Sequence, residues 1–163
     1  MPRHPAPRPG PPAAQTSGLP PSMADRVPFL LFRAAQASLV LANQMLASVG
    51  LCARQAGILT MVTELGPMTQ TGLGQALGVD RTTMVALLDD LEIKGYVQRH
   101  RHPGDRRAYL IQPTQAGRTA KAQAVRILDQ QQEAFLAGLT RAERGQLAAL
   151  LKRLHRPMPG PSN

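Results

Sequence analysis

Apolar residues recur three or four positions apart along most of the chain, the spacing of an amphipathic helix. The first such stretch covers about 25–48, because Pro28 is accepted only in the first turn of a helix. A second covers 54–64 and is followed by Gly66 and Pro67, a pair that ends helices. The pattern therefore predicts two helices in the first part of the chain.

Two shorter helices separated by a tight turn are predicted next. Thr69 can cap a helix that ends at Gly78, and Asp80 can cap the following one, which ends at Gly95. Apolar residues at positions i, i+3, i+4 and i+7 give this second helix one buried face. They are Met84, Leu87, Leu88 and Leu91. The segment is therefore predicted to be a helix-turn-helix.

A β-hairpin and two more helices complete the predicted domain. Segments 96–101 and 108–112 are predicted strands, joined by residues 102–105, which favour a turn. Thr114 begins a long helix, and a capping box begins the last one. The capping box consists of Thr140 and Glu143, and the last helix has Leu147, Leu150, Leu151 and Leu154 on one face. The predicted fold is mainly α with a small β-hairpin wing: four helices, the hairpin, then two helices.

The ends of the chain differ from the middle in composition. Residues 1–22 contain eight prolines and almost no large apolar side chains, so burial cannot offset their ordering entropy. We predict a disordered tail over 1–22, one folded domain over 23–156 and a flexible C-terminus over 157–163.

The charge balance favours a polyanionic partner. The chain of 163 residues has a formal net charge of +9, and aromatic residues make up only 3% of it. Its surface should attract phosphates but offers few rings to stack on unpaired bases, so duplex DNA fits better than a single strand. Basic residues are dense in and around the hairpin: Lys94, Arg99, Arg101, Arg106 and Arg107. The alternative is a basic surface that is only solvated.

A helix-turn-helix binds DNA when the first turn of its second helix reaches base edges in the major groove. Arg81, Thr82 and Thr83 occupy that turn; arginine can bind guanine with two hydrogen bonds, and threonine can contact phosphate or a thymine methyl. The hairpin can place Arg106 in the minor groove, with Asp105 orienting its guanidinium. The alternative is an ordinary helical hairpin with a solvated turn.

Four motifs point to a known family. They are Leu77-Gly-Val-Asp-Arg-Thr-Thr-Met, Leu87-Leu-Asp-Asp-Leu-Glu-Ile-Lys-Gly-Tyr-Val, Asp105-Arg-Arg and Thr114-Gln-Ala-Gly117. They resemble the recognition helix, the wing and the start of the fifth helix in the MarR family of bacterial regulators. The resemblance covers about 25–156. It implies a winged helix over 54–113, and a homodimer formed through the terminal helices, 25–48 and 114–156.

The resemblance also implies which residues contact DNA. The family's wing arginine corresponds to Arg106, and its recognition-helix positions to Arg81, Thr82, Thr83, Val85 and Ala86. The full predicted DNA-binding set is Thr69, Gln70, Arg81, Thr82, Thr83, Val85, Ala86, Arg99, Arg101, Arg106 and Arg107, with Asp105 as support for the wing.

The recognition helix departs from the family pattern in two ways. Val85 and Ala86 replace polar or basic residues and leave fewer hydrogen bonds for reading bases. The helix also carries Asp89, Asp90 and Glu92, so we expect it to insert by its N-terminal end with these carboxylates held away from phosphates. The helix is therefore expected to contribute less to sequence specificity than to DNA binding.

Other candidate sites carry less chemistry. Cys52 is the only cysteine, so no internal disulfide forms; it is either an inert, partly buried thiol or an oxidation sensor. His100 and His102 share a strand face without a third ligand in the sequence, so no metal is predicted. No nucleophile with a base and no phosphate-binding loop stand out, so neither an enzyme nor a cofactor is predicted.

The sequence thus predicts a cytoplasmic, sequence-specific regulator without a membrane span. Its partners would be double-stranded DNA at a pseudo-palindromic operator and a second copy of the chain. The resemblance implies repression that is released by a small-molecule effector or an oxidant. The alternatives are a non-specific architectural DNA-binding protein, and a small-molecule- or protein-binding module whose winged helix is degenerate.

Overall fold

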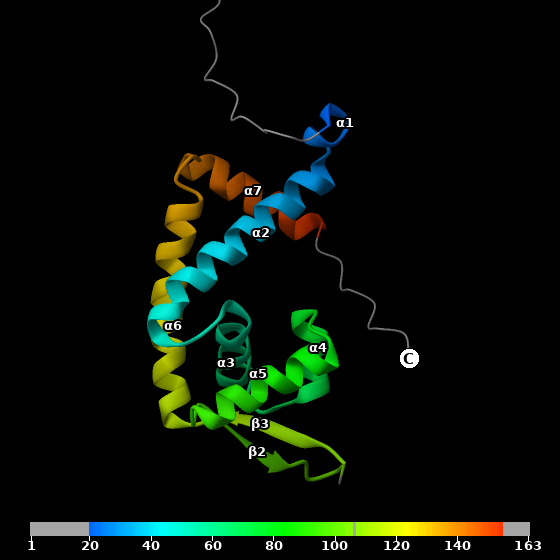
Figure 1. Ribbon diagram of the computed structural model, residues 1–163, viewed down its shortest axis with the longest axis vertical. Helices are drawn as coiled ribbons and strands as arrows, with labels where there is room; N and C mark the ends of the chain where they lie inside the picture. The colour runs from blue at the N-terminus through cyan, green and yellow to red at the C-terminus, as the bar shows by residue number, and fades with distance from the viewer. Residues whose placement is uncertain (1–19, 106, 155–163) are drawn as a thin grey trace, which may run out of the picture. The chain divides into compact units, whose positions relative to one another are not determined.

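A computed structural model describes residues 20–105 and 107–154 of the chain (Figure 1). The chain divides into two units, 1–36 and 37–163, which are described separately. Most of the predicted tail and the whole predicted C-terminus, 157–163, lie outside the described residues. However, the short helix α1 (Pro21–Ala24) begins inside the predicted tail, so the last two residues of that tail are helical and not disordered.

The helices and strands follow the predicted order. The first unit contains α1 and the start of α2 (Val27–Leu46). The second unit contains the rest of α2, the 3-10 helix η1 (Ala47–Val49), α3 (Ala53–Glu64), β1 (Met68–Thr69), α4 (Gln70–Leu77), α5 (Arg81–Ile93), β2 (Val97–Arg101), β3 (Tyr109–Pro113), α6 (Gln115–Phe135) and α7 (Arg141–Leu154). The predicted helix-turn-helix with its wing is therefore confirmed as α4, α5, β2 and β3.

The wing belongs to a three-stranded antiparallel sheet with strand order β1-β3-β2. Strands β2 and β3 pair from Val97 opposite Pro113 to Arg101 opposite Tyr109, as the hairpin prediction requires. Strand β1 pairs with β3 and was not predicted. It has two residues, too few to show the alternation that identifies a strand. Through β1, the base of the wing is joined to the start of α4.

Capping side chains begin the helices where the sequence predicts. The Oγ1 of Thr69 accepts a hydrogen bond from the N–H of Gly72 at 3.1 Å, and the Oγ1 of Thr114 accepts one from Gly117 at 3.0 Å. Asp80 accepts one from the N–H of Thr83 at 2.9 Å. These bonds satisfy backbone donors that have no partner within the helix.

The core of the second unit lies between α3, α4, α5 and the sheet. Its fully buried side chains come from all of these elements: Ile58, Leu59, Val62, Leu73, Met84, Leu88, Leu91 and Ile111. The predicted buried face of α5 is confirmed at Met84, Leu88 and Leu91, while Leu87 is half-buried. One face of α5 is therefore buried in the core, and the opposite face is exposed to solvent.

The long helices carry apolar residues that stay exposed in the single chain. In α7, Leu150, Leu151 and Leu154 are exposed, the last at 63%. In α2, Phe32 is exposed at 56% and Val27 at 61%. The resemblance implied that these helices form the interface of a homodimer, which remains a prediction.

Helix α2 together with η1, Val27–Val49, is long and apolar enough to cross a membrane by length and composition alone, with a mean hydropathy of 1.2. The sequence analysis had expected no segment of this kind. Polar bonds join its second half to other helices of the second unit: Gln131 of α6 donates to the carbonyl of Ser38 at 3.3 Å, and Asn43 accepts from the N–H of Ala53 at 2.8 Å. These bonds fit a helix that packs against protein.

Candidate nucleic-acid interface

The first turn of α5 presents the predicted base-reading residues. Gly78 adopts the left-handed conformation, with φ of 61°, and allows a three-residue turn between α4 and α5. Arg81 and Thr82 are exposed, and so are Val85 and Ala86 one turn later. Among the described residues, Arg81 forms no salt bridge. Its guanidinium is therefore free to bind an anion.

Two residues that were predicted to contact DNA, Thr69 and Thr83, also form hydrogen bonds that cap the helices of the helix-turn-helix. The hydroxyl of Thr83 donates to the Oδ2 of Asp80 at 2.6 Å, so its hydrogen is already used within the cap. The oxygen of Thr69 accepts from Gly72, which leaves its hydrogen available to a phosphate oxygen. Gln70 follows it as the first residue of α4 and is half-buried.

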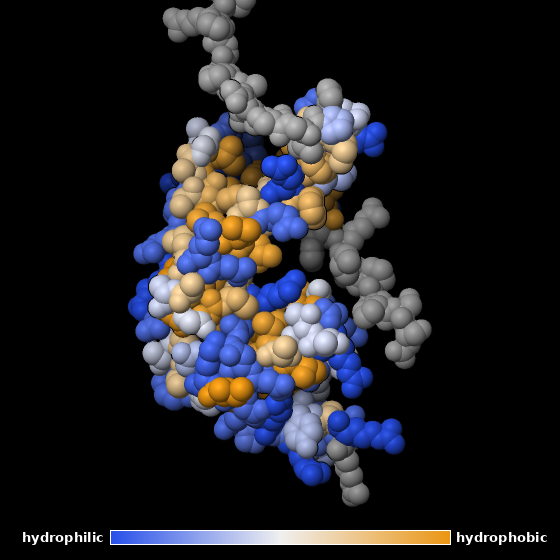
Figure 2. Space-filling model, viewed as in Figure 1, coloured by the Kyte–Doolittle hydropathy of each residue, from blue (hydrophilic) through white to orange (hydrophobic). Residues whose placement is uncertain are grey.

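The wing presents cationic side chains near its turn. Arg101 at the end of β2 and Arg107 beyond the turn are both exposed, and Figure 2 shows the mostly hydrophilic surface at this end of the molecule. The carboxylate of Asp105 accepts a hydrogen bond from the N–H of Arg107 at 2.9 Å, which shapes the turn. Arg106 lies outside the described residues, so its insertion into the minor groove and its support by Asp105 stay predictions.

Arg99 has different partners from those expected. One guanidinium nitrogen lies 2.5 Å from the Oδ1 of Asp89, and the other donates to the Oε2 of Glu92. Both carboxylates belong to α5, so the bonds join strand β2 to the recognition helix. Partial burial alone would lower the pKa of Arg99, but the two carboxylates raise it above its ordinary value. The predicted contact between Arg99 and DNA thus competes with two carboxylates that already accept from both terminal nitrogens of the guanidinium.

The third carboxylate in the second half of α5, that of Asp90, has other partners than Arg99. The Oδ2 of Asp90 accepts from Lys94 and from Gln55 of α3, each at 2.5 Å. These hydrogen bonds hold the pKa of Asp90 below its ordinary value. Lys94 also donates to the carbonyl of Gly50 at 2.8 Å. All three acids of α5 therefore accept hydrogen bonds from other side chains of the second unit. This agrees with the expectation that they are held away from phosphates.

The sequence analysis missed Gln55. This side chain is only 5% exposed and uses both ends of its amide, accepting from the N–H of Cys52 and donating to Asp90. A buried polar side chain needs such partners, but the sequence does not show that this glutamine is buried. Its position three residues after the N-cap of α3 was the available signal.

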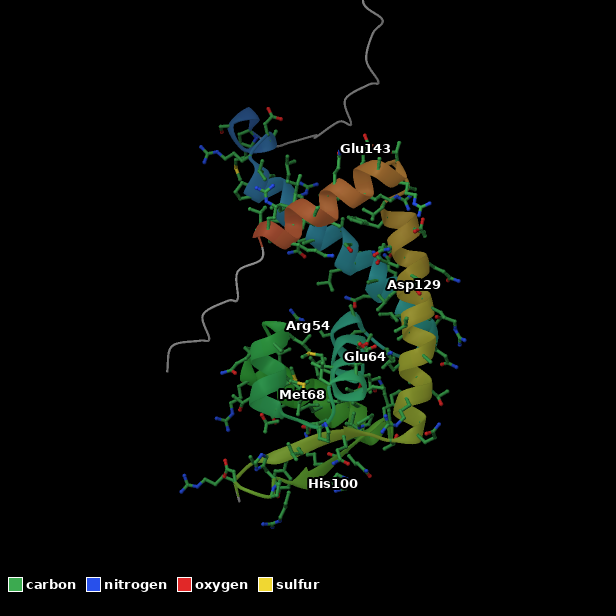
Figure 3. The ribbon with its side chains drawn as sticks, turned by 180° about the vertical axis from the view of Figure 1, so that it is seen from behind. Arg54, Glu64, Met68, His100, Asp129 and Glu143 are labelled. Atoms are coloured by element: carbon green, nitrogen blue, oxygen red, sulfur yellow. The ribbon has the colours of Figure 1, made fainter. Side chains whose placement is uncertain are left out.

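The remaining candidates stay isolated. Cys52 is the N-cap residue of α3 and is half-buried. His100 extends from the wing (Figure 3), and His102 accepts a hydrogen bond from the N–H of Gly104 at 3.1 Å. Over 20–105 and 107–154, no three His, Cys, Asp or Glu side chains gather as metal ligands would.

Comparison with known proteins places this chain among transcriptional regulators. The model of the MarR family matches residues 51–109. The putative transcriptional regulatory protein for the hcr operon of Thauera aromatica is 38% identical over 100 residues, which cover 61% of this chain and 60% of that protein. The match thus spans less than two thirds of that relative's length.

Solved structures agree over a longer region. A mutant of MarR from E. coli in complex with operator DNA is 26% identical, with a TM-score of 0.72 over 80% of this chain and 95% of that one. CouR from Rhodococcus jostii, bound to p-coumaroyl-CoA, is 27% identical, with a TM-score of 0.72 over 84% of this chain and 96% of that one. The fold of the winged helix and that of the long helices are thus both matched.

Proposed function

The chain belongs to the MarR family, and from this premise we propose that it is a transcriptional regulator that recognises operator sites in double-stranded DNA. The observation that carries the proposal is the arrangement of charge on the winged helix. Arg81, Arg101 and Arg107 are exposed, while Asp89, Asp90 and Glu92 are bonded to other side chains of the lobe. A helix that is acidic in composition therefore offers DNA its neutral and basic end.

The proposed regulator acts as a homodimer on a pseudo-palindromic operator. Two winged helices can reach successive half-sites only if the copies are joined about one helical turn of DNA apart. The exposed apolar residues of α7 support a seam of this kind, since a monomer rarely leaves such a row uncovered. We assign the interface to α2, α6 and α7, the helices that correspond to the predicted segments 25–48 and 114–156.

We also propose that the protein is a repressor whose DNA affinity falls when an effector binds. A similar protein, CouR, has been crystallised with p-coumaroyl-CoA, which supports a small molecule as the effector class. Oxidation of Cys52 is the alternative signal. An effector must bind the two conformations with different affinity, whatever its identity. The proposed role is regulatory and non-enzymatic, and it places the protein in the cytoplasm with the DNA.

Fluorescence anisotropy tests the DNA-binding proposal. The protein is titrated against duplex from upstream of its own gene and against a scrambled duplex at two salt concentrations. We expect tighter, salt-sensitive binding to the upstream duplex, because phosphate contacts release counterions. Arg106→Ala should weaken that binding about tenfold. The matched control is Arg54→Ala, which removes an exposed arginine from the first turn of α3, outside the proposed dimer interface and the predicted DNA-binding set.

Each alternative function gives its own result in this titration. Equal affinity for the two duplexes would replace the proposal with non-specific, architectural binding. Absence of binding to either duplex would point to a module with a degenerate winged helix. Unchanged binding by Arg106→Ala would remove the wing from the interface.

A further inference from the structure

Two arginines lie on the same face of strand β2 but have different surroundings. Arg99 and Arg101 are two residues apart, so their side chains leave the strand on the same side. Arg99 is half-buried, and its fork bonds Asp89 and Glu92 of α5. Arg101 is exposed and forms no salt bridge with any residue of 20–105 or 107–154. The same residue type therefore serves two purposes on one strand.

The fork of Arg99 leaves little capacity for a phosphate. An arginine binds an anion best through two parallel N–H donors, and here NH1 and NH2 each already point to a carboxylate. The side chain retains only 26% of its exposure. Turning this fork to a phosphate would require breaking both bonds and would leave Asp89 and Glu92 without a cation beside the DNA. Arg99 is thus a poor candidate for direct contact.

The two carboxylates have a cost for DNA binding that Arg99 removes. They stand three residues apart in the second half of α5, near the end of the helix that already carries partial negative charge. Arg99 reaches them from the strand that leads to the wing, and no other cation forms a salt bridge with either among the described residues. One side chain therefore offsets part of the negative charge of Asp89 and Glu92 and ties the wing to the helix.

We propose that Arg99 is a positioning residue that fixes the wing relative to the recognition helix through Asp89 and Glu92. The inference rests on the proposed function, because its benefit is a fixed geometry for binding DNA. Helix α5 and the wing enter different grooves, so their relative orientation decides whether both can bind at once. Exposed ion pairs add little to folding stability, so a change of DNA binding is the expected consequence of losing this one.

Removing the acids separates this role from a direct contact. Asp89→Ala combined with Glu92→Ala makes the protein more basic and releases Arg99. If Arg99 were a phosphate contact, this double variant would bind DNA more tightly and keep its preference for the upstream duplex. If Arg99 acts by positioning, the double variant loses preference even though its charge has become more favourable. The ratio of affinities for upstream and scrambled duplex is the readout, since it cancels the general effect of charge.

The expected result is a fall of about tenfold in that ratio, both for Arg99→Gln and for the double variant. The matched control is Lys121→Gln, which also loses one cation but only one salt bridge, that with Glu64 at 2.7 Å, away from the wing. We expect its ratio to equal that of the unmodified protein. A double variant that binds more tightly with an unchanged ratio would overturn the inference.

A second measurement needs no DNA and so separates this inference from the proposed function. Cys52 is the only cysteine, so spin labels can be placed at Gln75→Cys on α4 and Tyr109→Cys on β3 in a Cys52→Ser background. We expect the distribution of distances between the labels to broaden with Arg99→Gln and not with Lys121→Gln. If the unmodified protein shows no preference for the upstream duplex, the proposed function fails. The distances between the spin labels still test whether Arg99 positions the wing. Identical distributions in all three proteins would refute the positioning role.

Discussion

Replacing Gly117 with alanine is expected to damage the junction between the wing and α6. Gly117 lies in the first turn of α6 and packs against the backbone of Tyr96, the residue just before β2. A Cβ atom at this position would lie 2.0 Å from the carbonyl oxygen of Tyr96 and 2.9 Å from its carbonyl carbon. Both are backbone atoms, so no side-chain rotation relieves the clash. Helix α6 and the turn before β2 would have to move apart by about 1 Å.

The size of the effect follows from the bonds at this junction. The N–H of Thr114 donates to the carbonyl of Tyr96 at 3.0 Å, and its hydroxyl donates to the carbonyl of Gly95 at 2.6 Å. Overpacking costs about 1–3 kcal/mol, and losing two hydrogen bonds adds about 1 kcal/mol each. Alanine returns up to about 1 kcal/mol through its better helix propensity. The net loss of stability is about 2–4 kcal/mol.

Urea unfolding at a fixed protein concentration measures this loss, because association of copies would otherwise shift the apparent stability. The matched control is Gly57→Ala in α3, where the new Cβ meets only the flexible side chain of Leu77 at 3.4 Å. We expect that control to be neutral or slightly stabilising. A loss below about 1 kcal/mol for Gly117→Ala would show that the junction relaxes freely, contrary to the packing argument.

Two further predictions concern acid and the cap of α6. Hydrogen bonds from Lys94 and Gln55 depress the pKa of Asp90, so the stability they add is complete above about pH 4, where an unfolded aspartate is ionised, and is lost as pH falls through the lower folded value. Thermal melts should show a falling midpoint in that range, and Asp90→Asn should flatten the fall; an unchanged slope would contradict this assignment. Thr114→Val should cost about 1–2 kcal/mol in urea unfolding, because both the cap and the bond to Gly95 are lost. Thr119→Val, which removes only a bond within α6, serves as its control, and equal losses would refute the role of the cap.

Local signals accounted for most of the fold. The caps at Thr69, Asp80 and Thr114 place helix starts to the residue, because a side-chain oxygen must satisfy free N–H groups there. The periodicity of α5 identified its buried face for the same kind of reason, since the spacing of apolar residues is imposed by the helix itself. Strand β1 escaped prediction because its pairing with β3 depends on a distant segment.

The candidate site was predicted by residue type but not by residue role. Arg99 and Arg101 are equivalent in the sequence, and only the position of Asp89 and Glu92 in space distinguishes them. Likewise, nothing local connects Gln55 with Asp90, which lies 35 residues away. Interactions between side chains of different elements follow from packing, which periodicity and capping do not specify.

The arrangement of charge also bears on how selectively the protein reads DNA. The exposed face of α5 offers Arg81 and Thr82 for hydrogen bonds, followed by Val85 and Ala86, which can only pack against thymine methyl groups. On the proposed interface, affinity would therefore depend strongly on the cations of the wing, whose contacts with phosphates would carry little information about base sequence. Discrimination would then come largely from the shape of the minor groove and from simultaneous engagement of both grooves. A fixed angle between wing and helix, which Arg99 is proposed to provide, would allow a recognition helix with few polar groups to select its site.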